Sequence, residues 1–491
     1  MWEAAPYRPE REALACAYMP FSPPQRPSDG LVTDVAILGA GASGGLLAAA
    51  LLRAARSPLR VLLLEQSGRF YRGPAYTTTE PQHLLNVPAG RMSALADDPG
   101  HFLRWLRTVE PDAKETDFVP RARYAQYLDS VLAEAEAAAL PVVSLTQRHA
   151  RARRLTLVPG GVLLQLEDGT RVRAARAVLA LGNRPPAPLA VPDGGLYASE
   201  RYVALPWESG MGLETSDPDE SVLLLGSGLT AVDVALSLQA RGHRGPVHLL
   251  SRHGLLPQVH RAGVAPHAFA PRATTARALL HEVRDEVARV EVAGGNWRSV
   301  VDALRPHTAL LWQRLDVAEK RRLLRHLRAY WEPHRHRMAP QVGAAIAELR
   351  AQGQLHLHAG HVLGFALEHD DVVVRLRPRG QLEETQLRVQ RVLNCTGPSS
   401  LLAQPANSLV GELLSSGFAR ADPLGLGLET RNGALVDARG RASSRLFALG
   451  GVRRPELWES TAIPEIRAQA QALAQVLLPQ APEQPEHAPG P

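Results

Sequence analysis

Two apolar stretches of this chain run into glycines and continue with helical periodicity. The first, DVAILGAGASGGLLAAALL, starts at Asp34, and the second, SVLLLGSGLTAVDVALSL, starts at Ser221. A short apolar run, then glycines, then a helical pattern predict a buried strand, a tight turn and a helix. The uncharged residues 35–52 are numerous enough for a membrane span. Their glycines favour the strand–turn–helix interpretation, so we expect no membrane segment.

The rest of the chain alternates between β and helical patterns. Residues 157–169 predict a hairpin, because two β-rich runs flank a Pro-Gly-Gly turn. Residues 272–350 show helical periodicity with many arginines, and residues 355–397 return to β patterning. Residues 462–478 predict a closing helix. Strands that alternate with helices are typical of an α/β protein with parallel sheets.

The first glycine turn has the GxGxxG spacing of a dinucleotide-binding loop. Its first glycine makes the turn, its second lets the backbone approach a pyrophosphate, and its third allows helix and strand to pack closely. A second apolar strand, residues 61–64, ends at an acid placed to accept a hydrogen bond from a ribose hydroxyl. We therefore expect a dinucleotide to contact Gly39, Gly41, Ala42, Ser43, Gly44 and Glu65.

The second glycine turn is a GxGxxA variant, whose alanine still allows close packing. It would hold a second dinucleotide through Gly226, Gly228 and Thr230. The following strand, 247–250, ends in Ser-Arg-His, with no acid at the ribose position. Because Arg252 could pair with a 2′-phosphate that an acid would repel, the sequence favours NADPH over NADH. Since a flavin needs an electron source, we expect FAD on the first loop and NADPH on the second.

Three further segments, each a predicted strand that runs into glycine, fit a two-dinucleotide flavoprotein. Two resemble the crossovers that link FAD and nicotinamide domains, and the third resembles the strand and turn that close over the flavin. The Asp that often ends this turn is replaced by Gly451, which leaves open how the ribityl chain is held. The segments are residues 177–183, 392–398 and 446–451, and their expected cofactor contacts are Gly182, Gly397, Gly450 and Gly451.

These elements predict an α/β fold with two Rossmann-like dinucleotide-binding domains, one for FAD and one for NADP, and a helical insertion. A proline-rich arm at 1–30 and a tail at 479–491 are expected to be disordered. The other boundaries follow the crossovers. They give an FAD domain of residues 31–190 and 391–478, and an NAD(P) domain of residues 191–390 that includes the insertion 272–350.

Four long runs of the chain resemble YdhS-like FAD/NAD(P)-binding proteins of bacteria. They are residues 73–95 (GPAYTTTEPQHLLNVPAGRMSAL), 297–315 (WRSVVDALRPHTALLWQRL), 334–340 (HRHRMAP) and 457–470 (LWESTAIPEIRAQA). The resemblance extends from about residue 34 to residue 478. It implies the fold and both cofactors. Some similar proteins are flavin-dependent hydroxylases, including urate hydroxylases, and the wider group includes N-hydroxylating monooxygenases.

The run at 73–95 supplies the candidate catalytic side chains. In related flavoproteins this stretch runs beside the flavin, and His83, Asn86 and Arg91 are its polar residues best suited to face a ring or a substrate. We predict catalytic roles for Asn86 and His83. The alternative is that both residues only cap a turn.

The later runs add candidates for binding and capping. Arg335 and Arg337 are candidates to bind an anion, either the NADPH phosphate or an acidic substrate, and the alternative is a polar surface turn. The neighbouring histidines at 334 and 336 lack a third ligand of suitable spacing, so we expect no metal. Thr461 is predicted to cap the closing helix, whose N-terminus would face the flavin.

Composition narrows the chemistry. The chain has two cysteines, Cys16 and Cys395, whose distance in sequence excludes a CxxC redox pair and a cysteine-rich zinc site. The low cysteine content fits a reducing compartment, and we expect a cytoplasmic protein. The net charge is +6, and the arginine-rich region 272–350 leaves an RNA-binding flavoprotein as an alternative. We do not expect nucleic acid as the partner, because two dinucleotides already provide anions for the basic residues.

The sequence therefore predicts an FAD-dependent NAD(P)H oxidoreductase that acts on a small molecule with oxygen. We expect a monooxygenase that hydroxylates its substrate through a C4a-(hydro)peroxyflavin. The alternative is an NADPH:acceptor reductase without oxygen insertion. The missing CxxC argues against disulfide-reductase chemistry. The substrate and the oligomeric state stay open.

Overall fold

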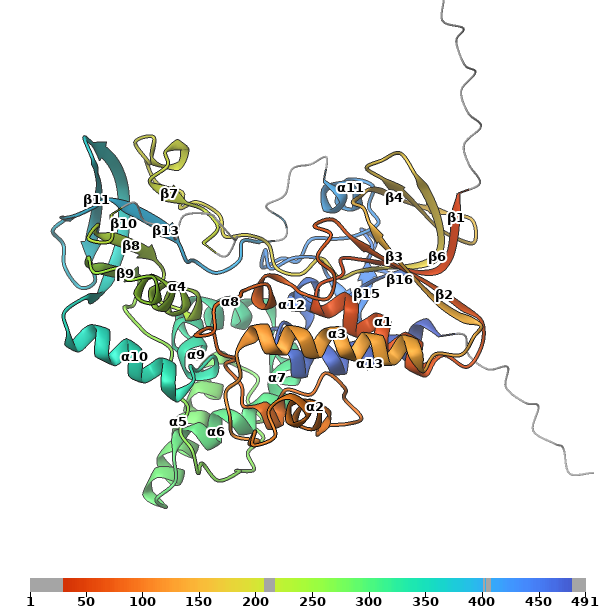
Figure 1. The fold of residues 1–491 in the computed structure, drawn as a ribbon, viewed down its shortest axis with the longest axis horizontal. Helices are drawn as coiled ribbons and strands as arrows, with labels where there is room; N and C mark the ends of the chain where they lie inside the picture. The colour runs from red at the N-terminus through yellow and green to blue at the C-terminus, as the bar shows by residue number, and fades with distance from the viewer. Residues whose placement is uncertain (1–29, 207–216, 401, 403–407, 479–491) are drawn as a thin grey trace, which may run out of the picture.

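Two β-sheets lie at opposite ends of the molecule, with a group of helices below and between them (Figure 1). The computed structural model describes residues 30–206, 217–400, 402 and 408–478. The predicted arm, apart from Gly30, and the predicted tail lie outside these residues. We call the sheet that contains the first glycine loop, with its helices, the first lobe, and the other sheet with its helices the second lobe.

The first lobe contains a nine-stranded sheet in the order β14-β15-β16-β6-β1-β2-β3, and the β4–β5 hairpin is attached through β6. The inner strands β6, β1 and β2 are parallel, as the strand–turn–helix pattern predicted. The predicted hairpin is confirmed, since β4 and β5 pair antiparallel around Pro159 and Gly160. The strands are β1 (Leu31–Leu38), β2 (Leu59–Glu65), β3 (Val143–His149), β4 (Ala152–Val158), β5 (Gly161–Leu166), β6 (Arg171–Leu179), β14 (Thr430–Arg431), β15 (Ala434–Val436) and β16 (Ala442–Ala448).

Helices cover both faces of this sheet. Helix α1 (Ala42–Ala54) packs against α3 (Arg121–Ala137) and α13 (Ile463–Leu477), and their apolar side chains form one core with β1 and β2. The hairpin and α11 (Leu409–Ser415) form a second core on the opposite face. The closing helix predicted at 462–478 is therefore present, and it packs mainly on α1, far from it in sequence.

The second lobe contains a seven-stranded sheet in the order β12-β11-β10-β9-β8-β13-β7. Its central strands β10, β9, β8 and β13 are parallel, and α4 (Leu229–Ala240) and α10 (Pro340–Ala351) pack against one face. The two sheets confirm the predicted α/β fold with two Rossmann-like units. The strands are β7 (Tyr202–Val203), β8 (Val222–Leu225), β9 (Val247–Ser251), β10 (Leu355–Glu368), β11 (Asp371–Pro378), β12 (Thr385–Val389) and β13 (Arg391–Asn394).

A helical region, α5–α9, follows β9 and lies beside both lobes (Figure 1). Several of its arginines pair with acids of their own helix, for example Arg322 with Glu319 and Arg328 with Glu332. None of the helices in the described residues has the length and apolar character needed to cross a membrane. The helices are α5 (Ala276–Val292), α6 (Trp297–Leu304), α7 (Thr308–Arg314), α8 (Val317–His326) and α9 (Arg328–Arg335); the shorter α2 (His101–Val109) and α12 (Arg454–Leu457) belong to other segments.

Buried polar contacts join the first lobe to α4 of the second. The Nη2 of Arg121 lies 2.7 Å from the Oδ2 of Asp233, and the two side chains are only 12% and 4% exposed. Nearer the surface, Arg241 pairs with Glu80 at 2.7 Å. Burial raises the pKa of Asp233, and the nearby Arg121 opposes this by favouring the carboxylate. The buried pair therefore needs both partners in place.

We expect Arg121→Met to lower the free energy of unfolding by about 3–5 kcal/mol, because it leaves a buried carboxylate without its cation. The measurement is the midpoint of denaturant unfolding. Arg72→Met is the matched control, since the Arg72–Asp129 pair is 45% and 37% exposed; an exposed pair contributes about 0–1 kcal/mol. Equal losses in both variants would contradict the importance of the buried pair.

Candidate functional site

The first glycine loop has the close packing that its motif requires. Gly39 has a φ of 103°, and a Cβ there would lie 2.4 Å from the carbonyl oxygen of Ala180. A Cβ on Gly44 would lie 1.9 Å from the carbonyl oxygen of Gly39. Helix α1 begins directly after Gly41, and no side chain caps it. The N–H groups of its first turn, which contains Ala42 and Ser43, are available to an anion at the loop.

Glu65 stands at the end of β2, beside this loop. Its Oε2 accepts a hydrogen bond from the backbone N–H of Ala40 at 2.9 Å, and its Oε1 accepts one from the backbone N–H of Ser67 at 2.9 Å. These bonds fix the carboxylate next to the glycine turn. The position suits contact with a ribose hydroxyl, as the sequence predicted.

The second loop repeats this geometry. Gly226 has a φ of 115°, and a Cβ there would lie 2.6 Å from the carbonyl oxygen of Cys395. Helix α4 begins after Gly228 without a side-chain cap, and a Cβ on Gly228 would meet no described heavy atom within 4 Å. Thr230 lies in the first turn of α4, and Arg252 is exposed just after β9. Both loops thus present uncapped helix ends at the carboxyl edge of a parallel sheet, where nucleotides bind in such folds.

The closing turn approaches the first loop. A Cβ on Gly450, whose φ is 69°, would lie 2.5 Å from the Oγ of Ser43, and the Gly450 N–H donates to Gln469 of α13 at 3.1 Å. A Cβ on Gly451 would lie 2.9 Å from the Oδ1 of Asn183. The turn therefore lies against both α1 and the first crossover. Cβ atoms built on the two crossover glycines, Gly182 and Gly397, would meet no described heavy atom within 4 Å.

The start of α13 differs from the prediction in one respect. Thr461 is not the N-cap: the cap position is Ala462, which has no side chain able to accept a hydrogen bond, and Thr461 is exposed. The helix starts one residue later than a Thr461 cap requires, because Ala462 has the extended backbone of the cap position. The preceding Ser460 is 1% exposed, and its hydroxyl has no hydrogen-bond partner among the described residues. A buried hydroxyl without a partner fits contact with a polar ligand atom.

His83 lies at the interface of the two lobes. Its side chain is buried, its Nδ1 is 2.7 Å from the Thr78 hydroxyl, and its Nε2 is 2.8 Å from the Ser237 hydroxyl and 3.1 Å from the Asp233 carbonyl oxygen. Burial lowers the pKa of its imidazole. A catalytic role for His83 stays a prediction, and these contacts favour a role in joining the lobes.

Asn86 is half-buried in the same segment, and its carbonyl oxygen accepts a hydrogen bond from the Nε2 of His260 at 3.0 Å. His260 follows β9, and its ring is tilted against that of Phe118, with the ring centroids 5.1 Å apart. The sequence did not identify His260, because it lies 174 residues from Asn86. A catalytic role for Asn86 stays a prediction, and His260 fixes the backbone that carries it.

The two arginines predicted to bind an anion are buried in ion pairs. The Nη2 of Arg335 lies 3.1 Å from Glu465, which also binds Arg305. Arg337 pairs with Asp302 of α6. Each guanidinium therefore already has a carboxylate partner. Anion binding by Arg335 and Arg337 stays a prediction that this pairing does not favour.

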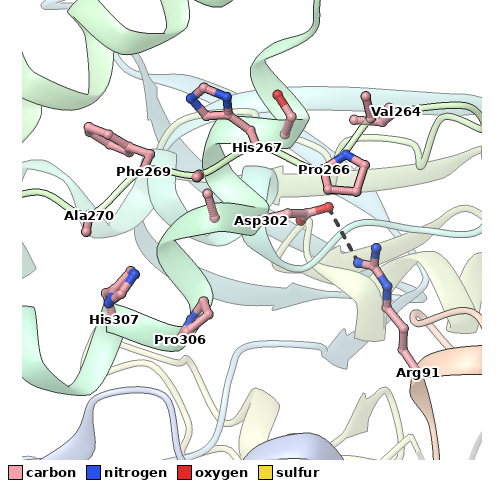
Figure 2. A pocket seen from close by; sticks show the side chains of 13 residues that line it. Arg91, Val264, Pro266, His267, Phe269, Ala270, Asp302, Pro306 and His307 are labelled. Carbon is pink, nitrogen blue, oxygen red and sulfur yellow. Dashed lines mark ion pairs between the residues drawn. The ribbon is translucent and has the colours of Figure 1, made fainter. Parts of the chain in front are cut away.

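A cavity of about 570 Å³ opens between η2 (Ala89–Arg91), the loop 264–270 and α6 (Figure 2). Figure 2 shows Arg91 reaching from the first lobe toward Asp302, while Phe269 and His307 border the other side. Its volume lies within the range of small-molecule sites, about 300–1,000 Å³. The lining residues are Arg91, Val264, Ala265, Pro266, His267, Ala268, Phe269, Ala270, Ser299, Asp302, Ala303, Pro306 and His307.

Comparisons with known proteins agree with this fold. Residues 36–184 match the model of an FAD-NAD(P)-binding family. Among solved structures, ornithine N-hydroxylase of Kutzneria sp. 744 is 17% identical with a TM-score of 0.57, over 91% of this chain and 99% of its own. The L-lysine 6-monooxygenase of Pseudomonas syringae is 16% identical with a TM-score of 0.60, over 91% and 99% of the two chains.

A third structure, the cadaverine monooxygenase DfoA of Erwinia amylovora bound to FAD, is 14% identical with a TM-score of 0.59, over 94% of this chain and 99% of that one. A comparison with curated proteins finds no match. At these identities the likeness establishes the shared fold. This chain thus shares the overall fold of these three proteins.

The half-buried His260 gives the protein an expected pH dependence. Burial, and then the charge of Arg337, lower the pKa of His260 to about 4, against about 6.5 in an unfolded chain. Between these values the unfolded chain binds a proton that the folded chain does not, so stability falls as the pH falls from about 6.5 toward 4. The loss reaches about 2 kcal/mol at pH 5.

The measurement compares denaturant midpoints at pH 7 and pH 5. His260→Gln keeps a donor for Asn86 but cannot titrate, so it should lose less stability than the wild type over this range. His149→Gln, at an exposed imidazole, should behave as the wild type. An unchanged pH slope in His260→Gln would rule out this role.

Proposed function

We propose that this protein is an FAD-dependent NADPH oxidoreductase of the monooxygenase type, which hydroxylates a small molecule. The observation that carries the proposal is the pair of uncapped glycine loops at Gly41 and Gly228, one in each lobe of one chain. The match of residues 36–184 to FAD-NAD(P)-binding proteins supports a flavin on the first loop. The solved structures with this architecture include hydroxylases of ornithine, lysine and cadaverine, which supports the reaction type.

We also propose the finer assignments that the sequence suggested. The chain is a YdhS-like protein, with an FAD domain formed by residues 31–190 and 391–478 and an NADPH domain formed by residues 191–390. FAD is held by Gly39, Gly41, Ala42, Ser43, Gly44, Glu65, Gly450, Gly451 and Thr461. NADPH is held by Gly226, Gly228, Thr230 and Arg252. The crossover glycines Gly182 and Gly397 also contact a cofactor.

The open space at the loops fits these cofactors. A Cβ on Gly228 or on the crossover glycines would meet no described heavy atom within 4 Å, so ligand atoms can approach the backbone there. The unpartnered hydroxyl of Ser460, behind the closing turn, could serve as a donor to a polar cofactor atom. When bound, a flavin supplies the capacity to accept a hydride from NADPH and to pass electrons to oxygen.

The residues of the chain then bind and orient the cofactors and exclude water from them. Glu65 accepts a hydrogen bond from a ribose hydroxyl, and Arg252 pairs with the 2′-phosphate. The Arg121–Asp233 pair and His83 fix α4, and with it the second loop, against the first lobe. His260 holds the backbone of Asn86 in place. Precise placement of reacting groups is the main contribution that a protein makes to such cofactor chemistry.

Cysteine placement separates this proposal from a disulfide reductase. Cys395 is the one cysteine among the described residues, and it is buried behind Gly226. Burial raises the pKa of its thiol well above the usual range, so it stays protonated. Electrons from NADPH therefore go to oxygen or to an external acceptor rather than to a protein disulfide.

Selectivity for NADPH tests the second loop. We expect Arg252→Met to raise the KM for NADPH about 10- to 100-fold, because a charge-assisted bond to a phosphate contributes about 1.5–3 kcal/mol. The KM for NADH should change less than about twofold by the same reasoning. The measurement is anaerobic flavin reduction with each nucleotide, and Arg244→Met, at an exposed pair with Asp219, is the control. Equal effects on both nucleotides would contradict the assignment of Arg252.

The reaction type is tested with the purified FAD-loaded protein. NADPH should bleach the flavin absorbance without oxygen, and a panel of small molecules should then be screened for faster NADPH oxidation in air. A product heavier by one oxygen atom identifies a monooxygenase. Fast NADPH oxidation that yields only hydrogen peroxide, or only a reduced acceptor, would replace the proposal with an oxidase or a reductase.

A further inference from the structure

The cavity beside α6 is separate from both glycine loops, and its walls differ in character. Val264, Pro266, Phe269 and Pro306 give it an apolar wall. Arg91 and Asp302 meet at the side that faces the first lobe, which we call the polar end, whereas His307 borders the opposite side (Figure 2). Concave sites with an apolar wall and a few converging polar groups are typical of small-molecule binding. What distinguishes this cavity is the balance of charge at its polar end.

Three guanidinium groups lie near one carboxylate there, and two of them pair with it. Asp302 pairs with the buried Arg337 and, at 3.7 Å, with Arg91. Arg298 lies in the same cluster, where its side chain donates to the carbonyl oxygen of Val259 rather than to an acid. Burial, and then the charge of Arg337, lower the pKa of Arg298, which shows how closely these cations are placed. The polar end therefore carries excess positive charge.

Arg91 is the cation best placed to meet a ligand. Its side chain is 62% exposed, and its 3.7 Å separation from Asp302 is too long for a hydrogen bond. Arg337 differs on both points, since it is 5% exposed and within hydrogen-bonding distance of Asp302. The fork of N–H donors on Arg91 can thus turn to a second anion without breaking a close pair.

We propose that this cavity binds a small organic acid, with its carboxylate on Arg91 and its apolar body against Phe269 and Pro266. This inference rests on the proposed function, because it assigns the substrate class of that enzyme. Arg91 also extends from the segment that carries Asn86, so the bound acid lies beside the part of the first lobe that the sequence placed next to the flavin.

The charged lining of the cavity does not suit an amine. Asp302 is the one carboxylate among the lining residues, and two arginines already share it. The lining residue His267 is paired at 2.7 Å with Glu286, which also binds Arg289. An ammonium group would therefore meet cations without an acid of its own. In this respect the cavity selects against the diamines and basic side chains named for the structural neighbours.

The test measures binding to the FAD-loaded full-length protein by isothermal titration calorimetry. The probes are hexanoate, hexanamide and hexylamine, which share an apolar body and differ in charge. We expect hexanoate to bind at least about tenfold more tightly than the other two, because each 1.4 kcal/mol is a factor of ten. Arg91→Met should weaken hexanoate at least about tenfold and leave hexanamide unchanged.

Two further variants locate the site. Arg104→Met is the matched control, because Arg104 is also 62% exposed and paired with an acid, Asp98, but does not line the cavity. It should bind hexanoate as the wild type does. Ala303→Leu, which fills the cavity from α6, should abolish hexanoate binding while circular dichroism stays unchanged.

Each outcome is decisive. Absence of hexanoate binding, equal binding of hexylamine, or normal binding by Arg91→Met overturns the carboxylate site. Flavin reduction by NADPH is measured on the same samples. If NADPH fails to reduce the flavin, the proposed function is wrong even where hexanoate binds, whereas normal reduction without hexanoate binding rejects the carboxylate site alone.

Discussion

Close packing of one backbone against another is the constraint on which both nucleotide loops depend. At Gly39 the loop after β1 contacts the carbonyl group that follows β6, and at Gly226 the loop after β8 contacts the carbonyl group that follows β13. These contacts exist because β1 pairs with β6 up to Leu38–Leu179, and β8 pairs with β13 up to Leu225–Asn394. The register of each parallel sheet therefore sets the shape of its loop. A side chain at either glycine would overlap a backbone that the sheet holds in place.

The interface between the lobes also fixes the position of the two loops relative to each other. Helix α4 carries the second loop at its N-terminus and Asp233 in its buried face. The contacts of Asp233 with Arg121 and of Ser237 with His83 thus fix the helix against the first lobe. Groups that react by hydride transfer need separations of about 3–3.5 Å. A rigid interface next to one of the two loops is a direct way to keep such a geometry.

The sequence alone predicted the features of the fold that depend on neighbouring residues in the chain. The glycine turns, the hairpin at Pro159 and the closing helix all follow from local periodicity and turn chemistry. The sequence alone did not predict which side chains pair with one another. Arg335 finds Glu465 across 130 residues and His83 finds Asp233 across 150, so no spacing rule could show that these polar residues are used inside the fold. The predicted N-cap of α13 was off by one position, because Ala462 has the extended backbone of the cap although its side chain cannot accept a hydrogen bond, and residue type alone favours Thr461.

The excess of arginine indicates where an anion can bind only when the ion pairs of the structure are known. Several of the arginines that looked suited to anions have their own acids, as Arg322 has Glu319 and Arg335 has Glu465. Such pairs present little net positive charge to an anionic ligand. The overall charge of +6 therefore does not indicate nucleic-acid binding. The surplus that remains near the cavity arises because Asp302 is shared. Unbalanced positive charge beside an apolar wall affects which ligands can bind in the cavity. In this protein it favours a ligand that carries a negative charge.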